Sequence, residues 1–195
     1  ESLFEKGRAL TSLGMYREAV RTFDKVLQIE KNHGEVYYYK GLALASLGRH
    51  DDAILALDKT LDLDPGYGQA CYQKGISLAA IGRKEDAIQA FDRALEIVPQ
   101  STEALLHRGM VLIQLGRFND AIESFIRTLE IDPTNADAWY LKGNALFALE
   151  GYDDAIEAFN RAIEIRPDFV SAYSDKGRAL SQLGMYTEAV LSLDN

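Results

Sequence analysis

Residues 136–169 read ADAWYLKGNALFALEGYDDAIEAFNRAIEIRPDF, and the rest of the chain repeats this stretch at intervals of 34 residues. A glycine and an alanine mark the register of the copies. They are Gly7, Gly41, Gly75, Gly109, Gly143 and Gly177, and Ala19, Ala53, Ala87, Ala121, Ala155 and Ala189. A fixed period of this length is typical of proteins built from stacked repeats. We therefore expect a single array, 1–195, with copies at 1–33, 34–67, 68–101, 102–135 and 136–169 and a partial copy at 170–195.

Each copy is predicted to form two helices joined by a short turn. In residues 136–169 apolar side chains recur at helical spacing twice, before and after a break near Gly151. Gly143 and Ala155 are small, and we expect them to let the two helices approach closely. Pro167 cannot continue the second helix and is expected to end it. The equivalent prolines are Pro65, Pro99 and Pro133.

The turn between the two helices has a glycine in five copies. These glycines are Gly14, Gly48, Gly82, Gly116 and Gly184. The fifth copy departs from the pattern, because Glu150 stands in the glycine position and Gly151 follows it. We expect a slightly rearranged connector there.

The unit resembles the tetratricopeptide repeat (TPR), and the resemblance covers the whole chain. The residues that carry it are Trp139, Gly143, Leu146, Ala155, Phe159 and Pro167. The resemblance implies an all-α fold, a right-handed superhelical α-solenoid of TPR helix-turn-helix repeats. In a solenoid each repeat packs only on its neighbours, so no single central core is expected.

Charge and composition argue against several classes of partner. The 195 residues carry a formal net charge of −9, and the sequence pI is about 4.9. Nucleic acids and anionic membranes bind basic surfaces, so neither is an expected partner. No apolar run approaches the roughly 20 residues of a membrane span, and we expect a cytoplasmic protein without membrane insertion. Cys71 is the one cysteine; it is predicted to be a small buried hydrophobe, compatible with a reducing compartment.

Catalytic, metal and cofactor motifs are not found in the sequence. The histidines, His33, His50 and His107, stand 17 and 57 residues apart and form no zinc-binding pair. No glycine precedes a lysine, so there is no phosphate-binding loop of the P-loop type. We therefore expect neither an enzyme nor a bound cofactor or metal.

A cation stands directly before the repeated glycine in every copy. The row is Lys6, Lys40, Lys74, Arg108, Lys142 and Lys176. One interpretation is a basic rail for an acidic partner. The favoured interpretation is that the aliphatic stems cover apolar surface while the charges pair with acids that also recur every 34 residues. Candidate acids are Asp62, Glu96, Glu130 and Glu164.

A second stripe on the first helices does not belong to the repeat pattern and is largely apolar from the second to the fifth copy. It lies three residues before, one after and four after the glycine, on one helical face. Its candidate binding residues are Tyr38, Leu42, Tyr72, Ile76, Leu106, Met110, Ile113, Tyr140, Asn144 and Phe147. The resemblance implies that this face lines a concave groove that holds a peptide. An alternative is tighter packing that buries some of these side chains between repeats.

The chemistry of the stripe favours an apolar or amphipathic partner. The tyrosines would supply contact area with a polar tip, and Asn144 would bond a peptide backbone. Some TPR domains hold a peptide carboxylate with a lysine three before and an asparagine one after the glycine. No copy here has that lysine and only Asn144 supplies the asparagine, so a carboxylate clamp is not expected. The asparagine ladder of sugar-transferase repeat domains is missing as well.

The leading hypothesis is a non-enzymatic scaffold that binds an apolar or amphipathic segment of another protein along this face. Two alternatives are a structural or self-assembling segment of a longer array, and the regulatory arm of an enzyme whose catalytic domain lies outside this chain. Self-assembly is suggested by the ends, because residues 6–10 and 14–16 recur unchanged at 176–180 and 184–186. Without a polar capping helix both ends should offer apolar surface, carried by Leu3, Phe4, Val190, Leu191 and Leu193.

Overall fold

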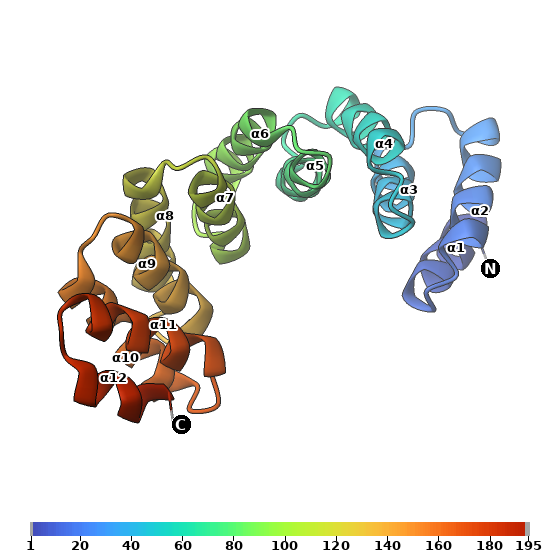
Figure 1. Ribbon diagram of the computed structural model, residues 1–195. Coiled ribbons are helices and arrows are strands. Elements are labelled where there is room, and N and C mark those ends of the chain that lie inside the picture. Colours follow the sequence, from blue (N-terminus) through green and yellow to red (C-terminus); the bar gives the residue numbers. More distant parts are fainter. Residues whose placement is uncertain (1, 194–195) are drawn as a thin grey trace. The chain divides into compact units, whose positions relative to one another are not determined.

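The computed structural model describes residues 2–193, and all regular structure in that range is α-helical. The chain divides into two compact units, Glu1–Pro99 and Gln100–Asn195, each built from three helical hairpins (Figure 1). The division falls in the connection between the third and fourth copies. The expectation of one array stays a prediction.

The first unit contains helices α1 to α6. Its hairpins are α1 (Leu3–Ser12) with α2 (Tyr16–Ile29), α3 (Gly34–Ser46) with α4 (His50–Leu63), and α5 (Gly68–Ala80) with α6 (Lys84–Ile97). Within this unit each hairpin packs on the next through its second helix, α2 against α3 and α4 against α5. The helices α3 and α5 begin at the predicted copy boundaries.

The second unit contains helices α7 to α12. Its hairpins are α7 (Thr102–Gln114) with α8 (Phe118–Ile131), α9 (Ala136–Ala148) with α10 (Tyr152–Ile165), and α11 (Val170–Gln182) with α12 (Tyr186–Leu193). Here α8 packs against α9, and α10 against α11. The first helices of these hairpins also begin at the predicted boundaries, so the helices of this unit follow the 34-residue spacing of the sequence.

The repeated glycine faces a buried side chain from the second helix of its own hairpin. A Cβ atom on Gly109 would lie 2.5 Å from the ring of Phe125, and one on Gly143 would lie 2.5 Å from the ring of Phe159. Both rings are fully buried. In the second copy Leu57 takes the place of the ring. The glycine is therefore required because a large side chain of the neighbouring helix occupies the space beside it.

The turns confirm the role of glycine and correct the expectation for the fifth copy. The turn glycines have positive φ angles, for example 73° at Gly48 and 72° at Gly116, and Glu150 adopts the same left-handed conformation with φ 62°. The amide of Gly151 donates to the carbonyl of Leu146 at 3.0 Å, as the amide of Arg49 does to that of Leu44 at 3.0 Å. The fifth connector is thus not rearranged. Glu150 instead adopts a left-handed backbone conformation, which is unfavourable for residues other than glycine.

Candidate functional site

In the first unit part of the predicted stripe is buried where one hairpin packs on the next. Tyr38 on α3 is buried, its hydroxyl donates to Oε1 of Gln69 on α5 at 3.3 Å, and its ring centroid lies 4.9 Å from that of Tyr67. Burial, together with the neighbouring Tyr67 and Tyr39, raises the pKa of Tyr38 to about 12. Tyr38 therefore joins the second hairpin to the third, as the alternative interpretation of the stripe expected.

The other predicted residues of the first unit keep part of their surface accessible. Leu42 is half-buried and packs against the cluster formed by Tyr38, Leu57 and Ala70. Tyr72 and Ile76 on α5 are half-buried. The ring centroid of Tyr72 lies 6.0 Å from that of Phe91. The accessible apolar surface of this unit is thus made by side chains that are also anchored in the core.

In the second unit α7 carries the most accessible part of the stripe. Met110 is 38% exposed, and Leu106 and Ile113 beside it are half-buried. These three residues stand at helical spacing on one face of α7. An exposed helix face is ordinarily polar, and this face of α7 departs from that rule because it is apolar.

Helix α9 links its part of the stripe to α11 through polar contacts. The hydroxyl of Tyr140 donates to Oδ2 of Asp175 at 2.9 Å. Burial raises the pKa of Tyr140; hydrogen bonding from Asn144 opposes the shift, and the bond to Asp175 adds to it. Asn144 and Phe147 are half-buried. Asn144 thus has a hydrogen-bond partner, Tyr140, within the chain. Its bond to a peptide backbone stays a prediction.

Asp175 and Arg178 extend this arrangement, although neither was among the predicted site residues. Nη1 of Arg178 lies 2.8 Å from Oδ1 of Asp175, and its guanidinium lies 5.1 Å from the ring centroid of Phe147. The carboxylate of Asp175 therefore forms an ion pair with Arg178 and accepts a hydrogen bond from the hydroxyl of Tyr140. The arginine one residue after the glycine was a readable signal, but its aromatic contact depends on how α11 packs on α9.

A related combination of an ion pair and ring contacts occurs in the first copy, with rings from other repeat positions. Arg8 also stands one residue after the repeated glycine and pairs with Glu5 at 3.3 Å. Its guanidinium lies 5.1 Å from the ring centroid of Tyr39 and 5.7 Å from that of Phe4. In both copies the arginine is therefore stacked on a ring and paired with an acid two residues before the glycine.

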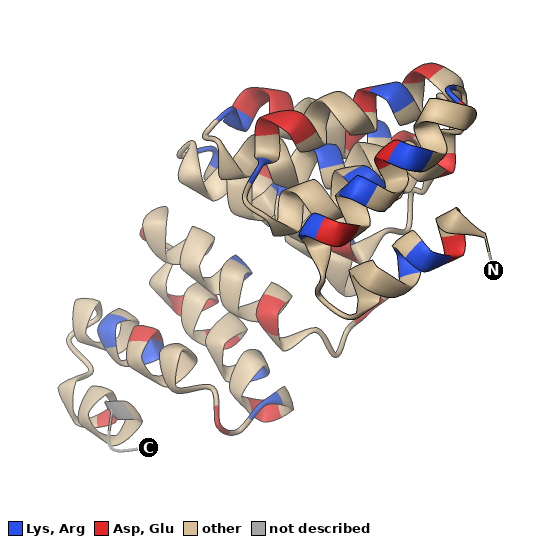
Figure 2. Ribbon diagram, turned by 90° about the vertical axis from the view of Figure 1, so that its right-hand side faces the viewer, with Lys and Arg blue, Asp and Glu red and all other residues tan. Residues whose placement is uncertain are grey.

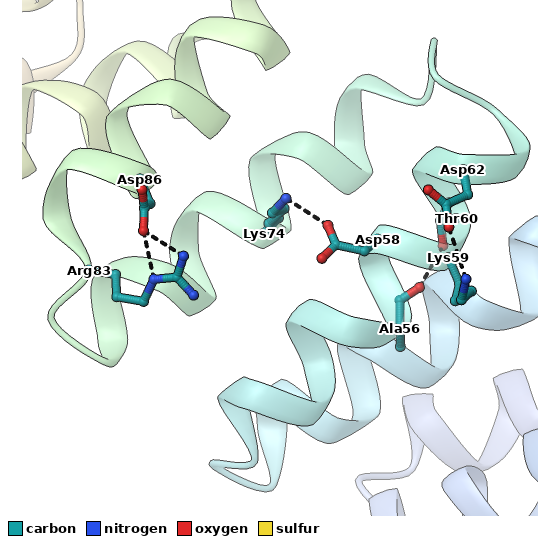
Figure 3. Close-up of polar contacts among 8 residues, drawn as sticks. All are labelled: Ala56, Asp58, Lys59, Thr60, Asp62, Lys74, Arg83 and Asp86. Carbon is teal, nitrogen blue, oxygen red and sulfur yellow. Dashed lines mark hydrogen bonds and ion pairs between the residues drawn. The ribbon is translucent and has the colours of Figure 1, made fainter.

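Two cations of the row pair with carboxylates, but not with those expected. Nζ of Lys74 on α5 lies 2.6 Å from Oδ1 of Asp58 on α4 (Figure 3), and Lys40 pairs in the same way with Asp24 at 2.6 Å. The partner is thus the second helix of the preceding copy. Three of the expected acids pair instead within their own helices. Those pairs are Lys59 with Asp62, Arg93 with Glu96 and Arg161 with Glu164.

The cations of the later copies have other contacts. Arg108 donates to Oγ of Ser124 at 2.7 Å, and Nζ of Lys142 lies 4.9 Å from the ring centroid of Trp139. For Lys142 and Lys176 the residues at the positions of Asp24 and Asp58 are Ile126 and Asn160, which carry no charge. The row therefore does not form a uniform basic rail. Acidic and basic residues are mixed along the helices (Figure 2).

Three shallow hollows lie at equivalent places in the second, third and sixth copies. Each is lined by the cation of the row and by the leucine three residues after the glycine. Their volumes are about 500, 240 and 390 Å³. Ion pairs such as Arg83 with Asp86 at 2.6 Å form part of the walls (Figure 3). The hollows thus recur at the same place in the repeat in these three copies.

Other kinds of site find no support in residues 2–193. Cys71 is buried in the wall of the hollow in the third copy, and burial raises the pKa of its thiol, which keeps it protonated. No group of three or more potential metal ligands is found in this range. None of its helices is long and apolar enough to cross a membrane.

Solved structures of similar fold cover most of the chain. The crystal structure of MamA is 28% identical over 83% of this chain and 94% of its own, with a TM-score of 0.80. YrrB, described as a TPR protein with an unusual peptide-binding site, is 27% identical over 89% of this chain and 90% of its own, with a TM-score of 0.79. The C-terminal part of a TPR repeat-containing protein from Cytophaga hutchinsonii is 20% identical over 97% of this chain and 77% of its own, with a TM-score of 0.87, and shows the fold alone.

Sequence comparison gives the same family. No curated protein matches the chain. A family model described as tetratricopeptide repeat matches residues 4–68, 56–102, 72–136, 106–168 and 140–194. With matches over nearly its whole length, the chain belongs to the tetratricopeptide repeat family.

Proposed function

We propose that this TPR protein is an interaction scaffold whose first helices bind an apolar or amphipathic segment of another protein. The single observation that carries the proposal is the apolar face of α7, where Met110 is 38% exposed between half-buried Leu106 and Ile113. A water-exposed face of this composition usually marks a contact surface. The family relationship and the peptide-binding site ascribed to YrrB support a protein or peptide as the partner.

The geometry of the second unit suggests how such a segment would be held. Apolar side chains of the partner would contact Met110 and Phe147, whose positions are fixed by the packing of their helices. The tip of Tyr140 is already bonded to Asp175, so the ring contributes contact area at little further cost in side-chain entropy. Arg178, stacked on Phe147, would favour an acidic residue in the partner next to its apolar anchor.

The proposal includes no catalysis and no cofactor. Its support on this point is the spacing of the histidines and the lack of a phosphate-binding loop in the sequence. A cytoplasmic location also remains part of the proposal. The one cysteine, Cys71, is free and buried, which is compatible with a reducing compartment.

Peptide selection followed by calorimetry tests the function. Random peptides displayed on phage and selected on the chain should converge on amphipathic sequences. Their affinity, measured with the parent and with Met110→Glu, is expected to fall about tenfold or more in the variant, because a charge would be placed against the apolar side of the peptide.

Ile126→Glu provides the matched control. Ile126 on α8 is 41% exposed, so it has the same accessibility as Met110 but lies outside the stripe. Its substitution should leave the peptide affinity within about twofold of the parent. Selected peptides that lose affinity with Ile126→Glu and keep it with Met110→Glu would place the binding surface on the second helices and refute the proposal.

A further inference from the structure

The hollow in the third copy combines an apolar floor with an excess of positive charge at its rim. Its apolar residues come from three helices and are Leu61 on α4, Cys71 and Leu78 on α5, and Ala90 on α6. Its charged residues are the cations Lys74, Arg83 and Arg93 and one acid, Asp86. The apolar residues are buried or half-buried, whereas the side chains of Arg83 and Arg93 are more than half exposed.

This hollow is large enough to take a side chain of another molecule. Its volume is about 240 Å³, which exceeds the roughly 150 Å³ of an apolar cavity that binds benzene. Burial raises the pKa of the Cys71 thiol at the floor, and the positive charges of Arg93 and Lys74 act in the opposite direction. The field of these two cations therefore reaches the floor, where it would attract a carboxylate that stands next to an apolar side chain.

The hollow lies well inside the chain and apart from the predicted stripe. All of its residues belong to the second and third hairpins. On α5, Lys74 and Leu78 stand one residue before and three residues after Gly75, whereas Tyr72 and Ile76 of the stripe stand three before and one after. These spacings place the two sets on different faces of the helix. The hollow is therefore a second surface, distinct from the stripe.

Each cation of the hollow already binds a carboxylate of the chain. The pairs, each 2.6 Å long, are Lys74 with Asp58, Arg83 with Asp86, and Arg93 with Glu96. The first two pairs are drawn in Figure 3. Ion pairs between exposed side chains contribute little free energy, so a carboxylate of another molecule can replace the chain's own at small cost. The pairs thus identify carboxylates as groups that these cations bind in their present positions.

The hollow of the second copy has the same construction in the adjacent hairpin. Its volume is about 500 Å³, and its apolar residues include Val20, Leu44 and Ala56. Its cations stand at the same repeat positions and are Lys40, Arg49 and Lys59. Two acids, Asp24 and Asp52, line this hollow, against one in the third copy. Of these two hollows the one in the third copy therefore has the larger excess of cations.

We propose that the hollow of the third copy binds an acidic segment of a partner protein. The segment places an apolar side chain in the hollow and carboxylates on Lys74, Arg83 and Arg93. The chain as a whole carries a formal net charge of −9, which disfavours such a segment elsewhere on its surface, so the local excess of cations selects the place. The hollow of the second copy takes a further apolar side chain of the same segment. This surface differs from the proposed peptide-binding face, and either proposal can fail alone.

Nuclear magnetic resonance titration of the 195-residue chain with a defined peptide tests this proposal. The peptide has one leucine between two pairs of glutamates, and its ends are capped so that they carry no charge. Amide signals of α5 and α6 should shift on binding, whereas those of α7 around Met110 should not. Two matched peptides, one with glutamines in place of the glutamates and one with serine in place of the leucine, should each bind at least about fivefold more weakly.

Charge reversal at the rim identifies the cations that hold the peptide. Arg83→Glu and Arg93→Glu should each weaken binding of the glutamate peptide about tenfold, because a like charge then faces its carboxylates. Arg17→Glu is the matched control, since Arg17 is an exposed arginine on α2 that lines neither hollow. The same change of charge there should leave the affinity within about twofold of the parent. All three positions are exposed, so circular dichroism should report an unchanged fold.

Position 89 offers a comparison that the repeat itself supplies. Gln89 lines the hollow, and its equivalents are Leu55 in the second copy and Glu123 and Glu157 in the fourth and fifth. The repeat accepts all three residue types, so Gln89→Leu and Gln89→Glu should both fold as the parent does. The glutamate adds a second carboxylate to the wall. Gln89→Glu should therefore bind the glutamate peptide at least about threefold more weakly than Gln89→Leu.

Other results would overturn the proposal. Equal weakening by Arg17→Glu and Arg93→Glu would assign the binding to net charge. Shifts of the α5 and α6 amides with inorganic phosphate but not with the glutamate peptide would make the hollow a site for small anions. A glutamate peptide that leaves these amides unchanged, or that loses affinity with Met110→Glu and keeps it with Arg93→Glu, would show that the hollow does not hold acidic segments.

Discussion

At the residue scale, the repeated glycine owes its place to the ring opposite it. A Cβ atom on Gly109 would lie 2.5 Å from the ring of Phe125, which is fully buried. Gly109→Leu should therefore lower the free energy of unfolding by at least about 1 to 3 kcal/mol, the usual cost of overpacking a core. Urea unfolding followed by circular dichroism measures the change.

Met110→Leu is the control for this substitution. It places the same side chain on the same helix, one residue later and at a position that is 38% exposed. Its urea midpoint should be close to that of the parent. If Gly109→Leu unfolds at the same urea concentration as Met110→Leu, the ring is not what requires the glycine.

A second prediction at this scale concerns the turn of the fifth copy. Glu150 has φ 62°, where the equivalent positions have glycine. Glu150→Gly should raise the free energy of unfolding by about 1 kcal/mol, because it relieves the left-handed conformation of a residue with a side chain. Thermal and urea unfolding test this. Glu150→Ala removes the same charge and keeps the strain, so an equal gain in both variants would point to the charge instead.

At the scale of elements, the sequence predicts the helices and their order but not every contact between them. The 34-residue period predicted where α3, α5, α9 and α11 begin, because spacing along one helix is local information. The partner of Lys74 was predicted incorrectly. Asp58 reaches it from the preceding hairpin, and a pairing of this kind depends on how hairpins stack. The burial of Tyr38 could not be read from the stripe for the same reason, since its cover comes from α5.

The junction of the second and third hairpins should depend on pH through Tyr38. Its pKa is raised from 10.0 to about 12, so the folded state keeps the proton after the unfolded state has lost it. The resulting stability is fully present below pH 10 and is lost as the pH rises from 10 to 12. Up to about 2 to 3 kcal/mol is involved at 1.36 kcal/mol per pKa unit.

Tyr38→Phe isolates this contribution because phenylalanine has no ionisable group. The free energy of unfolding of the parent should fall more steeply than that of the variant as the pH is raised above 10. Urea titrations at a series of pH values make the comparison. Parallel curves for the two proteins would mean that Tyr38 titrates alike in the folded and unfolded chains.

At the scale of the whole molecule, contacts are short-ranged along the sequence. Within each described unit a helix packs against its own hairpin and the adjacent ones, as the family implies. Stability in such arrays is approximately a sum of the stability of each repeat and of its junctions with its neighbours. Damage to one hairpin should therefore spread to its neighbours and weaken with distance along the chain.

Two reciprocal substitutions test this with hydrogen exchange. Gly41 and Gly143 each lie in the middle hairpin of a unit, and a Cβ atom would meet Leu57 at 2.9 Å in one and Phe159 at 2.5 Å in the other. Gly143→Leu should speed amide exchange in α7 to α12 and leave α1 and α2 as in the parent, whereas Gly41→Leu should speed exchange in α1 to α6 and spare α11 and α12. If both variants instead accelerate exchange evenly along the chain, the protein unfolds as one cooperative body, and the additive description of its repeats does not hold.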